Sequence, residues 1–216
     1  MAGRQAYDAR LAGCLCDECP LRSKRPVGPE GPADADLVIV GEAPGPQEEV
    51  RGRPFIGPSG MMLDDLLQKA GTSRDRVFIT NALCCRSEVP GETGQGRFEL
   101  KRYMAWLRTQ NVKIKREWKQ LKKAGPAPLI KSPFDCCRPR LLAELRWFED
   151  RARDTGRPNG AVVVPVGNYA LTALSGKAGI MKYRGAPLEA SSLVDEMPSL
   201  AACYYARGSP VTAEHE

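Results

Sequence analysis

The residues best suited to chemistry in this sequence are its cysteines. The chain has eight of them in 216 residues, and Cys16 and Cys19 form a Cys-x-x-Cys pair. Two thiolates at this spacing can reach one metal ion from a tight turn. Cys85 and Cys137 can complete a site of four thiolates. No signal-peptide pattern opens the chain, so we expect a reducing, cytoplasmic compartment, where thiols bind metal rather than form disulfides.

A second candidate site follows the segment LVIVGEA, residues 37–43. This short apolar run is typical of a strand that is buried on both faces. Glu42 lies at its carboxyl end, and Phe55 follows on a loop rich in Gly and Pro. Ligands of open α/β sheets bind just beyond the carboxyl ends of strands. A carboxylate and an aromatic ring there suit a planar ligand with polar edges, such as a base; the alternative is an ordinary strand–helix connection.

Strands and helices that alternate along the chain must position these residues. We expect strands at residues 37–43, 77–83, 161–167 and 199–207. We expect helices at residues 61–71, with Ser59 as the cap, at 139–155, with leucines on one stripe, and at 168–176. This alternation predicts an α/β fold, a parallel sheet with helices on both faces.

The composition indicates one globular domain, residues 1–216. The chain is 42% hydrophobic and 27% charged, and it has no apolar run long enough to span a membrane. Its net charge of +6 permits an acidic partner. Two segments stand apart within the domain: a cysteine-bearing N-terminal arm with its connector, residues 1–33, and an insertion, residues 91–133. We expect a monomer.

Several motifs resemble one known family. GEAPG, residues 41–45, is followed by GRPFIGPSG, residues 52–60. Together they closely resemble the first motif of the uracil-DNA glycosylase superfamily, especially its iron–sulfur-containing family 4 branch and related phage-type proteins. VVVPVGNYALTALSG followed by YRGAPLE resembles that family's strand–helix–Arg-Gly segment. With gaps, the resemblance runs from about Cys16 to Leu188, and it implies a three-layer α/β/α fold with a central four-stranded parallel sheet.

The resemblance also implies catalytic roles. The reaction would be hydrolysis of an N-glycosidic bond after a base is flipped out of DNA. Glu42 would lie near the sugar and the attacking water, and Glu48 matches a second acidic position on the same loop. Asn81 would bond the pyrimidine edge, because an amide can donate and accept together. The alternatives are structural: a loop-capping glutamate and a turn-forming asparagine.

The base itself would be held at the same strand end. In the family's pattern the backbone at Gly41 and Ala43 lies beside the base, and Phe55 would stack on it. Asn81 would again contribute, as the group that reads the edge of the base. For Phe55 the structural alternative is a core aromatic residue.

For the cysteines, the resemblance implies a [4Fe–4S] cluster bound by Cys16, Cys19, Cys85 and Cys137. Cys-Arg after a TNAL strand and Cys-Arg-Pro before a helix are the contexts of the family's other two ligands. Structural zinc and free buried cysteines are the alternatives. Adjacent cysteines could substitute as ligands, namely Cys14, Cys84 and Cys136. Cys203 lies in an apolar strand and is expected in the core.

The insertion carries most of the positive charge. Between residues 97 and 131, Lys and Arg number 11 against two acidic residues, a net charge of +9. Aromatic residues are interleaved with these cations, a pattern typical of nucleic-acid binding. We therefore expect DNA contacts from Lys113, Lys115, Arg116, Trp118 and Lys119. The alternative is a solvated helical hairpin whose aromatic residues pack on the body.

The chain departs from the family after its last strand. The branch has an HPS-type motif there, with a histidine that contacts the base oxygen, whereas this chain has Tyr204–Ser209. Arg207 could supply a cationic donor instead; His215 lies one residue from the end of the sequence. The segment after Cys85 also lacks the family's Pro-Pro-Gly-Asn-Arg pattern. We therefore expect weak or absent excision of ordinary uracil.

These observations predict a DNA glycosylase that flips a pyrimidine out of DNA and leaves an abasic site. Its target would be uracil or a modified, bulky pyrimidine, a substrate that would suit phage defence. One alternative is a non-catalytic member of the superfamily that binds damaged or single-stranded DNA. Another is a phage protein associated with a polymerase.

Overall fold

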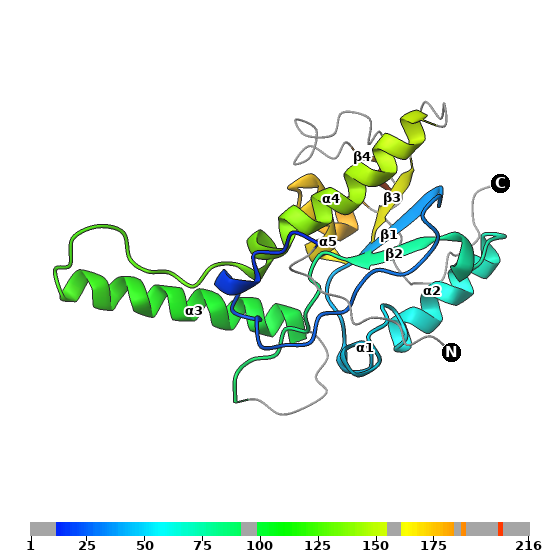
Figure 1. The fold of residues 1–216 in the computed structure, drawn as a ribbon. Helices are drawn as coiled ribbons and strands as arrows, with labels where there is room; N and C mark the ends of the chain where they lie inside the picture. Colours follow the sequence, from blue (N-terminus) through cyan, green and yellow to red (C-terminus); the bar gives the residue numbers. More distant parts are fainter. Residues whose placement is uncertain (1–11, 92–98, 155–160, 184–186, 189–202, 205–216) are drawn as a thin grey trace.

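The centre of the molecule is a sheet with the strand order β2-β1-β3-β5-β4. The structure is a computed structural model that describes residues 12–91, 99–154, 161–183, 187–188 and 203–204 (Figure 1). β1 (Leu37–Gly41) is central and pairs in parallel with β2 (Phe78–Asn81) and β3 (Val162–Pro165). The predicted parallel α/β sheet is therefore confirmed.

Two very short strands extend the sheet beyond β3. β5 (Cys203–Tyr204) pairs with β3 in parallel, and β4 (Pro187–Leu188) pairs with β5 in antiparallel orientation. The expected fourth strand, residues 199–207, is thus described over two residues only. The antiparallel edge strand was not expected from the sequence.

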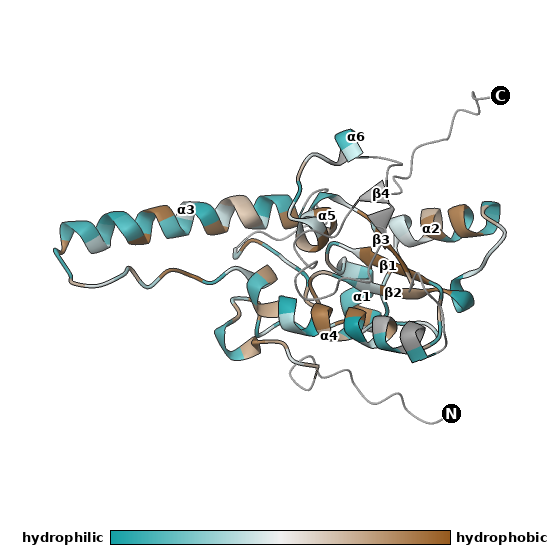
Figure 2. Cartoon of the chain, turned by 90° about the horizontal axis from the view of Figure 1, so that it is seen from above, coloured by the Kyte–Doolittle hydropathy of each residue, from teal (hydrophilic) through white to brown (hydrophobic). Residues whose placement is uncertain are grey.

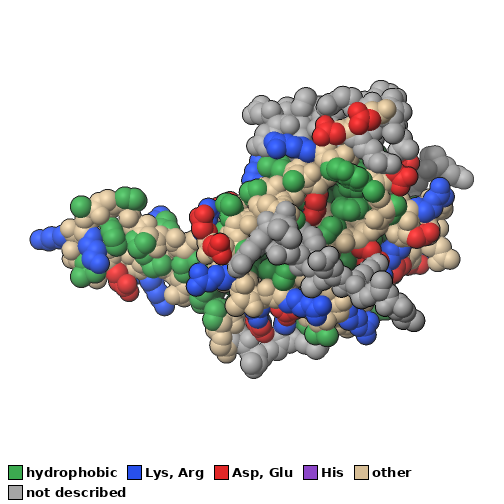
Figure 3. All heavy atoms as spheres, viewed as in Figure 1, with side chains coloured by type: hydrophobic (Ala, Val, Ile, Leu, Met, Phe, Trp, Pro, Cys, Tyr) green, Lys and Arg blue, Asp and Glu red, His purple; other side chains and the backbone are tan. Residues whose placement is uncertain are grey.

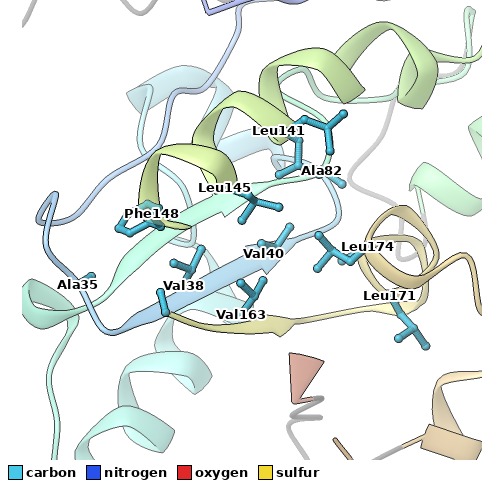
Figure 4. Packing of buried hydrophobic residues seen from close by; sticks show 13 residues of the cluster. Ala35, Val38, Val40, Ala82, Leu141, Leu145, Phe148, Val163, Leu171 and Leu174 are labelled. Atoms are coloured by element: carbon cyan, nitrogen blue, oxygen red, sulfur yellow. The ribbon is translucent and has the colours of Figure 1, made fainter. Parts of the chain in front are cut away.

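Helices cover both faces of the sheet. Alternate residues of β1 point to opposite faces, so Val38 and Val40 pack against α4 (Pro133–Asp154) and α5 (Asn168–Ser175). Figure 4 shows this packing, in which Leu145 and other α4 side chains point down onto the strands. Ile39 faces the other way, against α2 (Pro58–Lys69). α1 (Pro46–Arg51) lies on the loop before α2.

Two helices begin earlier than expected. α2 begins at Pro58 and has Gly57 as its N-cap, so Ser59 lies inside the helix and does not cap it. α4 begins at Pro133, not near Pro139, which lies within the helix. A proline at the first helical position loses no hydrogen bond, because the N–H there has no partner within the helix. Cys137 consequently lies on α4, not in front of it.

The insertion forms one long helix, α3 (Glu99–Gln120), which projects from the body and is followed by an extended return segment, residues 121–132 (Figures 1 and 2). We call this pair of segments the basic arm. It is not the helical hairpin considered above. Asn111 holds the return segment along α3, because its amide donates to the carbonyl of Ile130 at 3.0 Å and accepts from its N–H at 2.8 Å.

The remaining described helices are short. They are the 3₁₀ turns η1 (Cys16–Glu18) and η2 (Arg74–Arg76), and the helix α6 (Ile180–Tyr183). Among the described helices, none combines the length and the apolar character needed to cross a bilayer.

Candidate active site

Three of the predicted site residues meet at the carboxyl ends of β1 and β2. Gly41 and Asn81 are register partners at these ends. A Cβ atom at Gly41 would lie 2.3 Å from Oδ1 of Asn81 and 2.5 Å from the ring of Phe55. Only glycine therefore fits between the amide and the ring. The structure brings together a buried amide and a buried aromatic ring at the strand ends, as the sequence predicted.

Phe55 is held in an uncommon backbone conformation. Its φ angle is 51°, in the left-handed region that aromatic residues seldom adopt. Arg74 stabilises this turn, since its guanidinium donates to the carbonyl of Phe55 at 2.8 Å and also to the carbonyl of Pro54. Strained backbone of this kind is found at ligand-binding sites, where surrounding contacts maintain it.

Glu48 supports the same turn from α1. Its carboxylate is buried, and Oε1 accepts the N–H groups of Ile56 at 3.0 Å and Gly57 at 2.9 Å. These bonds stabilise the N-terminus of α2 and fix the loop that carries Phe55. The described geometry therefore gives Glu48 a role in shaping the loop.

Glu42 lies between the ends of β1 and β3. Its Oε1 accepts the N–H of Tyr169 at 2.9 Å, at the start of α5. A Cβ at Gly167 would lie 2.3 Å from the Glu42 side chain, and Gly167 has a φ of 111°, so only glycine fits there. Burial raises the pKa of the Glu42 carboxyl, and the N–H groups of Tyr169 and Asn168 oppose that shift.

Two further site residues were predicted, Ala43 and Arg207. The side chain of Ala43 packs against the buried cluster that contains the cysteines, and the prediction for its backbone stays a prediction. Arg207 lies outside the described residues.

The cysteines converge from three segments of the chain: residues 14–19, the end of β2 and α4. Seven of them line one cavity of about 210 Å³, with Arg22 and Lys24 at its wall. The Sγ atoms of Cys14, Cys84 and Cys137 all lie within 4.8 Å of one another. The predicted ligands Cys16, Cys19, Cys85 and Cys137 line the same cavity, as does Cys136. The donor set thus exceeds the four thiolates that a [4Fe–4S] cluster needs, and the residues fit such a group.

The three thiols of Cys14, Cys84 and Cys137 interact with one another. The Sγ of Cys14 lies 3.9 Å from that of Cys137 and donates to it. Hydrogen bonds from Cys14 and then Cys84 lower the pKa of Cys137. The thiolate is the form that binds metal.

The basic arm presents its cations to solvent. The side chains of Lys113, Lys115, Arg116 and Lys119 are exposed. In Figure 3 Lys and Arg side chains lie along the arm among hydrophobic ones. Trp118 also has contacts within the arm, because its indole N–H donates to the carbonyl of Gly125 at 3.0 Å and Lys123 lies over its ring. This tryptophan closes the tip of the arm.

The base of the arm rests on the cysteine cavity. Leu100, Tyr103 and Leu107 are buried in the same cluster as the cysteines. Glu99 adds an ion pair with Arg86, at 2.8 Å. The base of the arm is therefore packed against the segment that follows β2.

Arg140 is a component that the sequence pattern did not reveal. It is 1% exposed, lies on α4, and bonds to Thr80, Glu144 and the backbone of Asn81. The signal in the sequence is an Arg and a Glu four residues apart, set among the leucines of an apolar helical stripe. Buried charges of this kind are paired and often serve a specific local structure.

A sequence profile described as the uracil DNA glycosylase superfamily matches residues 29–206. This is most of the chain, and the chain belongs to that superfamily. The match includes β1, β2 and β3, with Gly41, Phe55 and Asn81.

Curated relatives narrow the branch. A type-4 uracil-DNA glycosylase of Pyrobaculum aerophilum is 40% identical over 94 residues, which are 43% of this chain and 47% of that protein. One of Thermotoga maritima is 45% identical over 73 residues, 33% of this chain and 38% of that protein. The predicted resemblance to the family 4 branch is confirmed. The matches span less than half the length of these relatives.

Proposed function

We propose that this protein is a DNA glycosylase that removes a flipped pyrimidine, uracil or a modified one, and leaves an abasic site. The observation that carries the proposal is the meeting of Gly41, Phe55 and Asn81 at the carboxyl ends of two parallel strands. An aromatic ring and a buried amide there offer stacking and edge recognition to one base. The names of the type-4 relatives support the same activity.

The chemistry requires two developing charges to be stabilised. As the N-glycosidic bond breaks, the sugar becomes cationic and the departing pyrimidine becomes anionic. The Asn81 amide is the donor we assign to the base. Glu42 is the carboxylate we assign to the sugar side, since it is fixed by the N–H of Tyr169 at the neighbouring strand end. Glu48 acts indirectly, by holding the loop that presents Phe55.

The cysteine cavity is proposed to hold a [4Fe–4S] cluster with Cys16, Cys19, Cys85 and Cys137 as ligands. When bound, such a cluster supplies a covalent link between the N-terminal segment, the end of β2 and α4. The chain's own contacts point to the same structural role: the N–H of Leu15 donates to the carbonyl of Cys136 at 2.9 Å, and the N–H of Val27 to that of Cys84 at 2.8 Å.

The ionisation of Glu42 should shape the pH dependence. Burial raises its pKa, so the acidic limb of kcat/KM should lie at a higher pH than an ordinary glutamate gives, about 4.3. Glu42→Gln keeps an acceptor for the Tyr169 N–H and should abolish this limb while lowering the plateau. Because the pKa of Glu42 is raised in the folded state, ionisation of this carboxyl destabilises the folded protein above that pKa. The Glu42→Gln variant carries no such charge, so at neutral pH it should unfold at no lower temperature than the wild type.

The measurement is a pH–rate profile of both proteins, with thermal unfolding at neutral pH as the check on folding. The same acidic limb in the Glu42→Gln variant would show that another group titrates and would remove Glu42 from the mechanism.

The basic arm is proposed to bind DNA phosphates. Replacing Lys113, Lys115, Arg116 and Lys119 together with Ser should weaken DNA binding, because fewer counterions are released. On duplex DNA, the slope of log K against log[salt] should become shallower by about 0.9 for every phosphate that the arm no longer neutralises. The matched control changes the three lysines to arginine and should keep affinity and slope. An unchanged slope in the Ser variant would make the arm a structural or protein-binding element.

The experiment that tests the function is base release from defined DNA. Duplexes and single strands that carry uracil or modified pyrimidines are incubated with the protein, and alkali then cleaves any abasic site. Release of one of these bases supports the proposal. Binding to DNA with no abasic product would assign the chain to the non-catalytic class.

A further inference from the structure

Arg140 bridges the helix that carries Cys136 and Cys137 and the strand end that carries Asn81. One terminal nitrogen, Nη1, donates to the hydroxyl of Thr80 at 2.9 Å and to the carboxylate of Glu144 at 2.8 Å. The other, Nη2, donates to the carbonyl of Asn81 at 2.5 Å and to that of Ala82 at 3.2 Å. The hydroxyl of Thr80 in turn donates to Glu144 at 2.9 Å.

The bond from Arg140 to the carbonyl of Asn81 lies at an edge of the sheet, where no neighbouring strand can provide a hydrogen-bond partner. β2 is the outer strand, so the backbone groups on its free side need other partners. The N–H and C=O of Ile79 point to that side and pair with Glu30, at 2.7 and 2.9 Å. Asn81, two residues on, points its carbonyl the same way. Arg140 is the donor that the described structure places on this carbonyl.

The side chain of Asn81 leaves the strand on the opposite face from α4. Thr80 faces α4 and Arg140, whereas Asn81 faces Gly41 and Phe55. The guanidinium therefore binds the backbone carbonyl of Asn81 and does not occupy the face of the sheet on which the amide side chain lies. A fixed peptide limits the directions in which that amide can point.

We propose that Arg140 is a positioning residue for Asn81, which sets the amide at the angle needed to bond the flipped base. The proposal rests on the proposed glycosylase function. A planar guanidinium suits this task, because it satisfies two carbonyls, a hydroxyl and a carboxylate in one fixed arrangement. Small displacements of a catalytic group lower rates steeply, by about 10²-fold for 1 Å.

Two variants test this without an orphaned buried charge. Arg140→Lys keeps the pair with Glu144 but loses the planar fork. The double variant Arg140→Met with Glu144→Leu removes both charges, and such apolar replacements can preserve stability. In single-turnover assays on the DNA that the wild type cleaves, each should lower the rate of base release by about 10-fold or more. DNA affinity should stay within about twofold. Arg76→Lys, an exposed arginine on η2, is the control and should match the wild type.

Backbone hydrogen exchange supplies a readout that does not need activity. The N–H groups of Ala82 and Leu83 bond to the carbonyls of Gly41 and Glu42 at 2.8 and 3.0 Å. They should exchange faster in Arg140→Lys, while Ile79 keeps its protection. Wild-type rates of base release, or unchanged exchange at both amides, would overturn the proposal. If the wild type itself releases no base, the glycosylase function fails, and the exchange data then decide separately whether Arg140 holds the strand end.

Discussion

Replacing Asn81 with alanine is expected to lower the rate of base release by about 10²–10³, with DNA affinity nearly unchanged. The loss is large because the amide bonds most strongly to the base when negative charge develops on it, in the transition state. In other enzymes, removing one preorganised donor to a developing anion lowers the rate by about 10²–10³. Asn81 is 6% exposed and lies against Gly41 and Phe55, so its amide is largely shielded from bulk water.

The test compares single-turnover rates with binding constants on the same DNA. Gln68→Ala removes an exposed amide from α2 and should leave both quantities unchanged. Equal losses of rate and affinity would show that Asn81 only binds DNA. An unchanged rate would remove the amide from the mechanism.

Replacing Cys137 with alanine is expected to abolish iron binding and to lower the yield of soluble protein strongly. Wild-type protein isolated without oxygen should be brown and carry about four irons per chain. Cys137 belongs both to the ligand set that the resemblance implies and to the tight trio with Cys14 and Cys84. Its loss should also loosen the basic arm, because Leu100 and Tyr103 pack in the same cluster.

Single alanine variants of the other cysteines decide the ligand set. The family's pattern predicts that Cys16→Ala loses the iron and that Cys14→Ala retains it. Cys203, on β5, is the control and should keep full occupancy. Iron retained without Cys16 but lost without Cys14 would reassign the ligands. A colourless protein with one zinc would replace the cluster by a structural zinc site.

The sheet could be predicted because its strands are short, apolar and bounded by turn residues. LVIVG and VVVP needed no tertiary information. The start of α4 could not be predicted, because proline is typical of a first helical turn and both Pro133 and Pro139 fit that pattern. The helix begins at Pro133. The strand at residues 199–207 was also expected, and β5 lies within it, whereas the two-residue strand β4 leaves too little periodicity to detect.

The site shows the same division. Gly41, Phe55 and Asn81 follow strand and loop motifs, so their meeting could be predicted. The bonds of Glu48 to Ile56 and Gly57 depend on how the loop folds back, so this structural contact could not be predicted. Arg140 acts across about sixty residues of sequence, on Thr80 and Asn81. Long-range contacts of this kind leave little trace in one sequence.

The most direct test of the central claim is release of a base by the wild type, measured beside Asn81→Ala. Strands with uracil or a modified pyrimidine at one position are incubated with each protein, treated with alkali and separated, and the free base is identified by mass. The account predicts cleavage at that position by the wild type and a loss of about 10²–10³ in rate for the variant. DNA binding without an abasic site from any pyrimidine would contradict it.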